Sequence, residues 1–201
     1  MKSAAEQIAF DEQAIKRLLD AWGLWRDTCR FDKLRACYAP GATMVTTWFD
    51  GTASDFVDAS IRSSTAATLT QHFIGPSTIE VHEARALAET RLILMGRTKL
   101  EDVDIDVTCY GRLFDRLVRT GDGWRILSRM PIYEKDTLAA VDPGLAVQLD
   151  AVRLKTYPAA FRHLAYVQAS SGATITSRIP PHNSPAQREL YAEAQTWLRA
   201  G

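Results

Sequence analysis

The sequence predicts an α+β protein in which helices come first and a curved antiparallel sheet follows. Apolar residues recur at helical spacing between Asp11 and Cys29. Residues 78–99 and 104–133 are instead rich in β-branched and aromatic side chains. This separation of helices from strands favours helices packed on one side of an antiparallel sheet. A curved sheet backed by helices is expected to enclose a pocket.

The N-terminal elements follow from local signals. The first helix is expected between Asp11, as N-cap, and Cys29, with its apolar stripe on the core. A second short helix over residues 31–39 is predicted to end at Pro40-Gly41. Residues 42–51 then read as a β-rich segment that Asp50-Gly51 closes.

The middle of the chain is predicted to change from helix to strand. Residues 52–70 suggest a third helix that leads into the segment around His72. The run Thr120-Gly121-Asp122-Gly123 is a strong hairpin signal, and we expect it to join the last two long antiparallel strands.

The C-terminal part has a different composition. Residues 157–169 and 186–200 read as helices, separated by a loop-like stretch. We therefore predict an α+β domain over residues 1–141 and a helical extension over 142–201. The apolar faces of the extension need a surface to cover, which we expect to be the cavity mouth or a neighbouring subunit.

Composition excludes several classes of function. The 201 residues include 24 basic and 24 acidic side chains without a basic block, which disfavours nucleic acid as a partner. No apolar run is long enough to cross a bilayer, so we expect a cytoplasmic protein and no membrane partner.

The sequence predicts no cofactor and no metal. The three cysteines are widely spaced, without a Cys-x-x-Cys pair, and are expected to be small buried side chains. His82, His163 and His182 lack the close second ligand of a metal site. Nucleotide-binding glycine motifs are also lacking.

Three separated residues could together perform proton transfer. An imidazole can both accept and return a proton, so His72 could serve as a base if the carboxylate of Asp27 holds its tautomer. Arg129, in an otherwise apolar strand, could bind a leaving group or a developing oxyanion. On composition alone, Asp27 reads equally as a solvated helix-end residue, His72 as structural and Arg129 as a surface strand residue. An inward Asp27 requires the helix to end or unwind near Arg26.

A family resemblance favours the catalytic interpretation. Residues 14–44, the QHFIG segment at 71–75 and residues 121–143 resemble the SnoaL-like branch of the nuclear transport factor 2-like superfamily. The superfamily also includes scytalone dehydratase and hexachlorocyclohexane dehydrochlorinase, and the resemblance spans about residues 8–143. It implies a cone-shaped α+β barrel with a deep apolar cavity.

The resemblance also implies residue roles. Asp27 would orient the base His72, and Arg129 would occupy the place of the dehydrochlorinase arginine. The lysine that the dehydrochlorinase carries in its first helix is replaced here by Trp22, which weighs against chloride elimination. The pocket would thus be more aromatic, and the expected substrate-binding residues are Trp22, Trp25, Tyr38, Trp48 and Tyr110.

These expectations favour a cofactor-independent lyase that acts on a small aromatic or hydroaromatic substrate. It would release a small group such as water, a halide or formaldehyde. The alternatives are an isomerase or cyclase with the same base, the non-catalytic β subunit of an aromatic-ring-hydroxylating oxygenase, or a module that binds an apolar ligand. The family resemblance also implies a homo-oligomer, either a trimer or a dimer.

Overall fold

The computed structural model describes residues 3–64 and 69–200. In these residues the predicted helices and strands occur in the predicted order, and the short helix at residues 151–154 is an element that the sequence did not predict. The helices are α1 (Ala4–Asp27), α2 (Phe31–Arg35), α3 (Ala53–Ser63), α4 (Ala151–Leu154), α5 (Arg162–Ser170) and α6 (Pro185–Arg199). The strands are β1 (Tyr38–Thr46), β2 (Phe49–Thr52), β3 (Leu69–His82), β4 (Arg85–Leu100), β5 (Val103–Thr120) and β6 (Gly123–Ala140).

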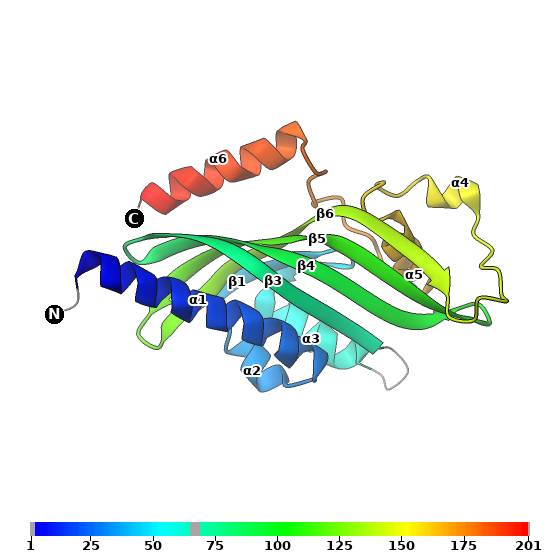
Figure 1. The fold of residues 1–201 in the computed structure, drawn as a ribbon, viewed down its shortest axis with the longest axis horizontal. Helices are drawn as coiled ribbons and strands as arrows, with labels where there is room; N and C mark the ends of the chain where they lie inside the picture. Colours follow the sequence, from blue (N-terminus) through cyan, green and yellow to red (C-terminus); the bar gives the residue numbers. More distant parts are fainter. Residues whose placement is uncertain (1–2, 65–68, 201) are drawn as a thin grey trace.

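Within the described residues, the strands form one curved sheet that does not close on itself. Its order is β2-β1-β6-β5-β4-β3, so β2 and β3 are the two edges. Every neighbouring pair is antiparallel except β1 and β6, which run parallel. Figure 1 shows α1, α2 and α3 on one side of the sheet and α6 on the other. The predicted α+β class with a curved sheet is confirmed.

Helix α1 begins earlier than predicted. Ser3 is its N-cap, and a capping box links Ser3 with Glu6. Asp11 therefore lies inside the helix, where its buried carboxylate accepts hydrogen bonds from Arg119 at 2.7 and 2.5 Å. The prediction that Asp11 caps this helix was wrong, because the capping box provides an earlier start.

The second helix is shorter than predicted, and a strand replaces its end. Helix α2 stops at Arg35, and β1 begins at Tyr38. Pro40-Gly41 lies inside β1, where the register with β6 shifts and Gly41 adopts a φ of +74°. A bulge thus accommodates the residues that were expected to end a helix.

The hairpin after β1 also differs from the prediction. Thr46 pairs with Phe49, so the turn lies at residues 47–48 and Asp50-Gly51 lies within β2. The predicted helix over residues 52–70 is α3, which ends at Ser63. Residues 65–68 of that prediction lie outside the described part of the chain.

The predicted hairpin between the last two long strands is confirmed. Thr120 pairs with Gly123, and Gly123 has a φ of +104°, a conformation that glycine adopts without strain. The two strands that it joins are 18 residues each and supply the centre of the sheet.

The C-terminal extension uses both faces of the sheet. Helix α5 packs with its buried Leu164 in the main core, on the face that also carries α1. Helix α6 packs on the opposite face, where Ala194 and Leu198 meet Leu87, Phe114 and Ile132.

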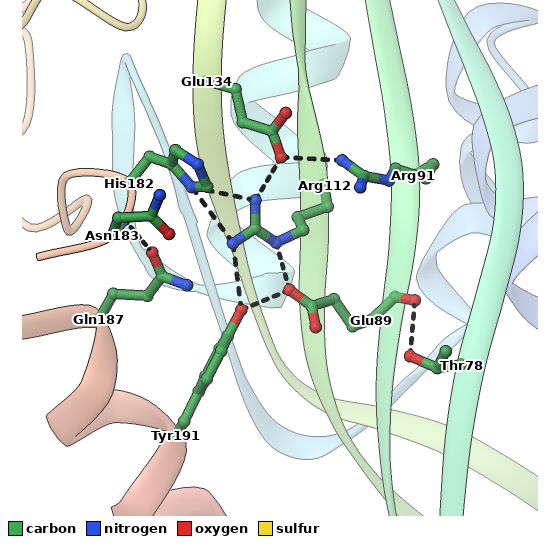
Figure 2. Close-up of polar contacts among 9 residues, drawn as sticks. All are labelled: Thr78, Glu89, Arg91, Arg112, Glu134, His182, Asn183, Gln187 and Tyr191. Atoms are coloured by element: carbon green, nitrogen blue, oxygen red, sulfur yellow. Dashed lines mark hydrogen bonds and ion pairs between the residues drawn. The ribbon is translucent and has the colours of Figure 1, made fainter.

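A network of polar side chains links the C-terminal extension to this second face of the sheet. The guanidinium of Arg112, on β5, forms ion pairs with Glu89 and Glu134. It also contacts Nδ1 of His182 at 3.3 Å and the hydroxyl of Tyr191, on α6, at 3.3 Å. Figure 2 shows these side chains converging between the sheet and the C-terminal segment. The extension is therefore tied to the sheet by buried charge as well as by apolar contact.

Candidate active site

A cavity of about 530 Å³ lies between the sheet and the helices. Its wall includes side chains from α1, α3, β1, β3, β4, β5, β6 and α5. Its volume is within the range of small-molecule sites. Much of the wall is apolar, with Met44, Phe56, Leu92, Val107, Leu113 and Leu164 among the lining residues.

His72 and Asp27 meet at the wall of this cavity. Oδ1 of Asp27 lies 2.5 Å from Nδ1 of His72, and Oδ2 accepts the backbone N–H of His72 at 2.6 Å. Both side chains are 13% exposed, and both line the cavity. The predicted pairing of these two residues, 45 positions apart, is present.

The pair forms because α1 ends beside the edge strand β3. Asp27 is the last residue of α1, as an inward carboxylate requires. One turn earlier, Gly23 lets the helix approach β3 closely, because a Cβ there would lie 2.7 Å from Cγ1 of Ile74. The small residue on the helix and the strand beneath it thus fix the distance between carboxylate and imidazole.

The geometry assigns the two ring nitrogens different tasks. With Nδ1 held by the carboxylate of Asp27, Nε2 is the nitrogen left to exchange a proton. The ring of Trp22 packs against the imidazole edge-on, with centroids 5.5 Å apart and planes at 83°. Both contacts restrict rotation of the imidazole.

The predicted aromatic residues divide into two groups. Trp22 and Trp48 line the cavity, whereas Trp25, Tyr38 and Tyr110 lie outside its lining. Tyr38 lies behind Trp22, whose Nε1 donates to the Tyr38 hydroxyl at 2.7 Å. Burial raises the pKa of Tyr38. A part in substrate binding stays a prediction for the residues outside the lining.

Arg129 lies one layer behind the cavity wall. It is 1% exposed and pairs with the Asp115 carboxylate through two hydrogen bonds of 2.7 and 2.8 Å. Its guanidinium also stacks over the Trp22 ring, 4.2 Å from the centroid. Burial raises the pKa of Asp115, and the charge of Arg129 opposes that rise. Because Arg129 is outside the lining, its predicted contact with a leaving group stays a prediction.

Two parts of the cavity wall were not predicted from the sequence. Arg26 lines the cavity beside Asp27, and α5 contributes Leu164, Val167 and Gln168. A basic residue in the last turn of a helix is commonly explained by the helix dipole, so Arg26 gave no distinct signal. The extension was expected to cover either this cavity or a neighbour's, and α5 lines its own.

A second histidine–aspartate pair was also missed, outside the cavity lining. The carboxylate of Asp136 accepts the backbone N–H groups of His163 and Leu164 at 2.6 and 2.9 Å, and Oδ1 lies 2.8 Å from Nδ1 of His163. The sequence treats His163 as a lone histidine, because Asp136 lies on a strand 27 residues earlier. This pair caps the first turn of α5.

The described residues contain neither a metal-binding cluster nor a helix that could span a membrane. In residues 3–64 and 69–200, no three His, Cys, Asp or Glu side chains gather in a metal-binding group. None of the helices described is long and apolar enough to cross a membrane.

Comparisons with known proteins agree with this architecture. A family model for the SnoaL-like domain matches residues 7–130. Pea pathogenicity protein 2 of Fusarium vanettenii is 27% identical over 206 residues, which cover 96% of this chain and 88% of that protein. A scytalone dehydratase-like protein from Novosphingobium aromaticivorans superposes with a TM-score of 0.58 at 18% identity, covering 72% of this chain and 99% of its own. A type 2 hexachlorocyclohexane dehydrochlorinase superposes with a TM-score of 0.59 at 12% identity, covering 74% and 99%. At these identities the two solved structures show a shared fold.

Proposed function

Because this chain belongs to the SnoaL-like domain family, we propose that it is a cofactor-independent lyase in which His72 is the general base. The observation that carries the proposal is the contact between Asp27 and His72 at the wall of a largely apolar cavity. The names of the two structural neighbours, a dehydratase and a dehydrochlorinase, agree with an elimination reaction.

The elimination needs one base and a site that tolerates charge. Nε2 of His72 removes a proton from an activated C–H or hydroxyl group of the substrate. For water or a halide, the electron pair left behind forms a new double bond as the leaving group departs with the electrons of its bond. For formaldehyde, the pair left on the deprotonated hydroxymethyl oxygen forms the C=O bond, and the electrons of the broken C–C bond stay on the substrate carbon, which the imidazolium then protonates. Asp27 stabilises the imidazolium, which for water or a halide returns the proton to the leaving group or to solvent.

The cavity favours a small aromatic or hydroaromatic substrate. Trp22 and Trp48 offer aromatic surface at the wall, and Phe56 packs within 5.7 Å of Trp48, measured between ring centroids. Flat apolar rings can stack on such side chains, and a volume of about 530 Å³ accommodates one or two of them. The group released would be water, a halide or formaldehyde.

The test is a substrate screen without added cofactor, followed by removal of the base. Candidate substrates are aromatic alcohols, lignin-derived diaryl compounds and halogenated cyclohexanes, and mass spectrometry identifies the group lost. For a substrate that is turned over, His72→Ala should lower the rate on the order of a hundredfold or more. A folded His72→Ala protein with full turnover would refute the assignment of the base. A product with the same mass as its substrate would identify an isomerase or cyclase instead.

We also propose that the protein is a homodimer or homotrimer. The edge strand β3 is 14 residues long and exposes Leu69 and Phe73, and Leu24 is exposed on the adjoining helix α1. Long apolar edges of this kind are commonly covered by another chain. Light scattering coupled to size-exclusion chromatography measures the stoichiometry, and obligate copurification with a larger subunit would favour the β-subunit role.

A further inference from the structure

The charged residues that line the cavity differ in whether they have partners. They are Arg26, Asp27 and Arg97, together with the titratable His72. Both oxygens of Asp27 are occupied by His72. Arg97 is bound by both oxygens of Asp106, each at 2.7 Å. The cavity therefore has one carboxylate and one guanidinium that are already paired with other side chains.

Arg26 is the exception. Within residues 3–64 and 69–200, its guanidinium forms no ion pair and no hydrogen bond. The remaining residues of the chain include no Asp or Glu that could supply a partner. Arg26 is half-buried, so water reaches only part of a side chain that carries five N–H donors.

The surroundings of Arg26 disfavour an unpaired charge. Burial lowers the pKa of Arg26, against the opposing charge of Asp27. A half-buried guanidinium at an apolar wall is strongly stabilised when a carboxylate binds its planar fork through two parallel hydrogen bonds. A bound anion would thus offset the burial that disfavours the charge of Arg26.

We propose that Arg26 is the anion-binding residue of this cavity, and that the protein's natural ligand is an aromatic or alicyclic carboxylic acid. The carboxylate pairs with Arg26 while the ring extends toward Trp22 and Trp48. This inference rests on the proposed function only in naming the ligand a substrate, because the binding itself requires no turnover. It places the anionic group in the same cavity as the base, because Arg26 and His72 both line it.

The chemistry benefits from that placement. A proton removed from carbon near a carboxylate leaves negative charge on the substrate, and a fixed guanidinium stabilises that charge as it develops. Arg26 would serve both to hold the substrate and to receive this charge. Arg129, already paired with Asp115, is less available for either task.

Binding of matched ligand pairs tests the proposal. Isothermal titration calorimetry measures benzoate, cinnamate, 4-phenylbutyrate and biphenyl-4-carboxylate against the corresponding neutral amides. For the wild-type protein, at least one carboxylate should bind about tenfold to a hundredfold more tightly than its amide, as expected for a charge-assisted pair. If every carboxylate binds no better than its amide, the proposal is overturned.

Substitutions test whether Arg26 causes the preference for carboxylates over amides. Arg26→Gln should reduce the carboxylate-to-amide ratio to about one, and Arg26→Lys should retain part of it because the charge remains. Arg17→Gln is the matched control, because Arg17 is an exposed arginine on the same helix and outside the lining. Arg97→Gln, which removes the paired cation, should also keep the ratio.

His72 is the competing cation, because a protonated imidazole could also hold an anion. His72→Asn should keep the carboxylate preference even though it removes the proposed base. A preference that persists in Arg26→Gln and vanishes in His72→Asn would overturn the role of Arg26. Inactivity of the wild-type protein in every turnover assay, together with an Arg26-dependent preference, would instead refute the lyase and leave the anion site standing.

Discussion

The guanidinium of Arg129 stacks on the ring of Trp22, with 4.2 Å between its central carbon and the ring centroid. Trp22 in turn packs edge-on against His72. Arg129, which the sequence predicts as an anion-binding residue, is thus connected to the base His72 through the ring of Trp22. On its other side, Asp115 holds it with two hydrogen bonds. Arg129 therefore supports the back of the cavity wall, whether or not it also acts on a substrate.

The first prediction concerns the partner of Arg129. Asp115→Asn preserves the shape of the side chain and removes its charge, which leaves a fully buried guanidinium unpaired. We expect this variant to lose about 3–5 kcal/mol of unfolding free energy, because an isolated buried charge is strongly destabilising. Urea denaturation followed by far-ultraviolet circular dichroism measures the loss.

Asp106→Asn provides the comparison for that variant. It breaks the exposed pair with Arg97, in which both side chains are about half exposed. Solvent screens such a pair, so the cost should stay within about 1 kcal/mol. Equal losses in the two variants would show that the Arg129–Asp115 pair does not behave as a buried one.

A second prediction concerns the approach of α1 to β3. Gly23→Ala places a Cβ 2.7 Å from Cγ1 of Ile74, so helix or strand must shift. Since Asp27 follows one turn later, the distance from its carboxylate to His72 should change. A displacement of this kind is expected to lower turnover about tenfold to a hundredfold.

The double variant Gly23→Ala/Ile74→Ala tests the cause. It removes Cγ1 and Cδ1 of Ile74, the two side-chain atoms that the new Cβ would meet, and leaves the backbone oxygen of His72 at 3.3 Å, so it should restore most of the activity. Ile74→Ala alone measures the cost of the lost packing. If the double variant stays as slow as Gly23→Ala, close approach at this point does not set the geometry of the pair.

The sequence predicts long-range pairing only where a family pattern supplies it. The family pattern supported the pairing of Asp27 with His72, and the local turn signal Thr120-Gly121-Asp122-Gly123 correctly placed the hairpin. Local signals failed where a tertiary contact outweighed them. Asp11 has the side chain of an N-cap, but Arg119 and Trp124 hold it inside a longer helix.

Tertiary contacts also explain why the sequence did not predict every residue of the cavity wall. Helical periodicity does not reveal that Arg26 meets the cavity, because the last turn of α1 reads equally well as solvated. The contribution of α5 depends on how a C-terminal segment folds back over β6. Such contacts arise between elements distant in sequence, so propensity and spacing carry little information about them.

The third prediction is an acid-dependent loss of stability from Asp11. The hydrogen bonds from Arg119, opposed by burial, lower the pKa of the Asp11 carboxyl to about 2. In the unfolded chain this pKa is about 3.9, so the folded state is stabilised above pH 4 and loses that stabilisation as the pH falls toward 2. The contribution should be about 2 kcal/mol, seen as a steeper fall in unfolding free energy for wild type than for Asp11→Asn.

Asp20→Asn is the control for this pH series. Asp20 pairs with Lys16 on the surface of the same helix, where both side chains are more than a third exposed. Its removal should leave the acid dependence close to that of wild type. Parallel curves for wild type and Asp11→Asn between pH 4 and 2 would contradict the assignment.

The last prediction concerns how α5 is held over the cavity. The carboxylate of Asp136 accepts two backbone N–H groups at the start of α5, those of His163 and Leu164. Asp136→Ala should therefore loosen the helix that supplies Leu164 and Val167 to the cavity wall, at a cost of about 1–2 kcal/mol. Hydrogen exchange should become faster in residues 162–170, and ligands that fill the cavity should bind more weakly. Asp150→Ala removes the corresponding cap of α4, which has no buried residue, and should leave ligand binding unchanged. A loss of ligand binding in both variants would mean that the extension responds as one unit and not through the cap of α5.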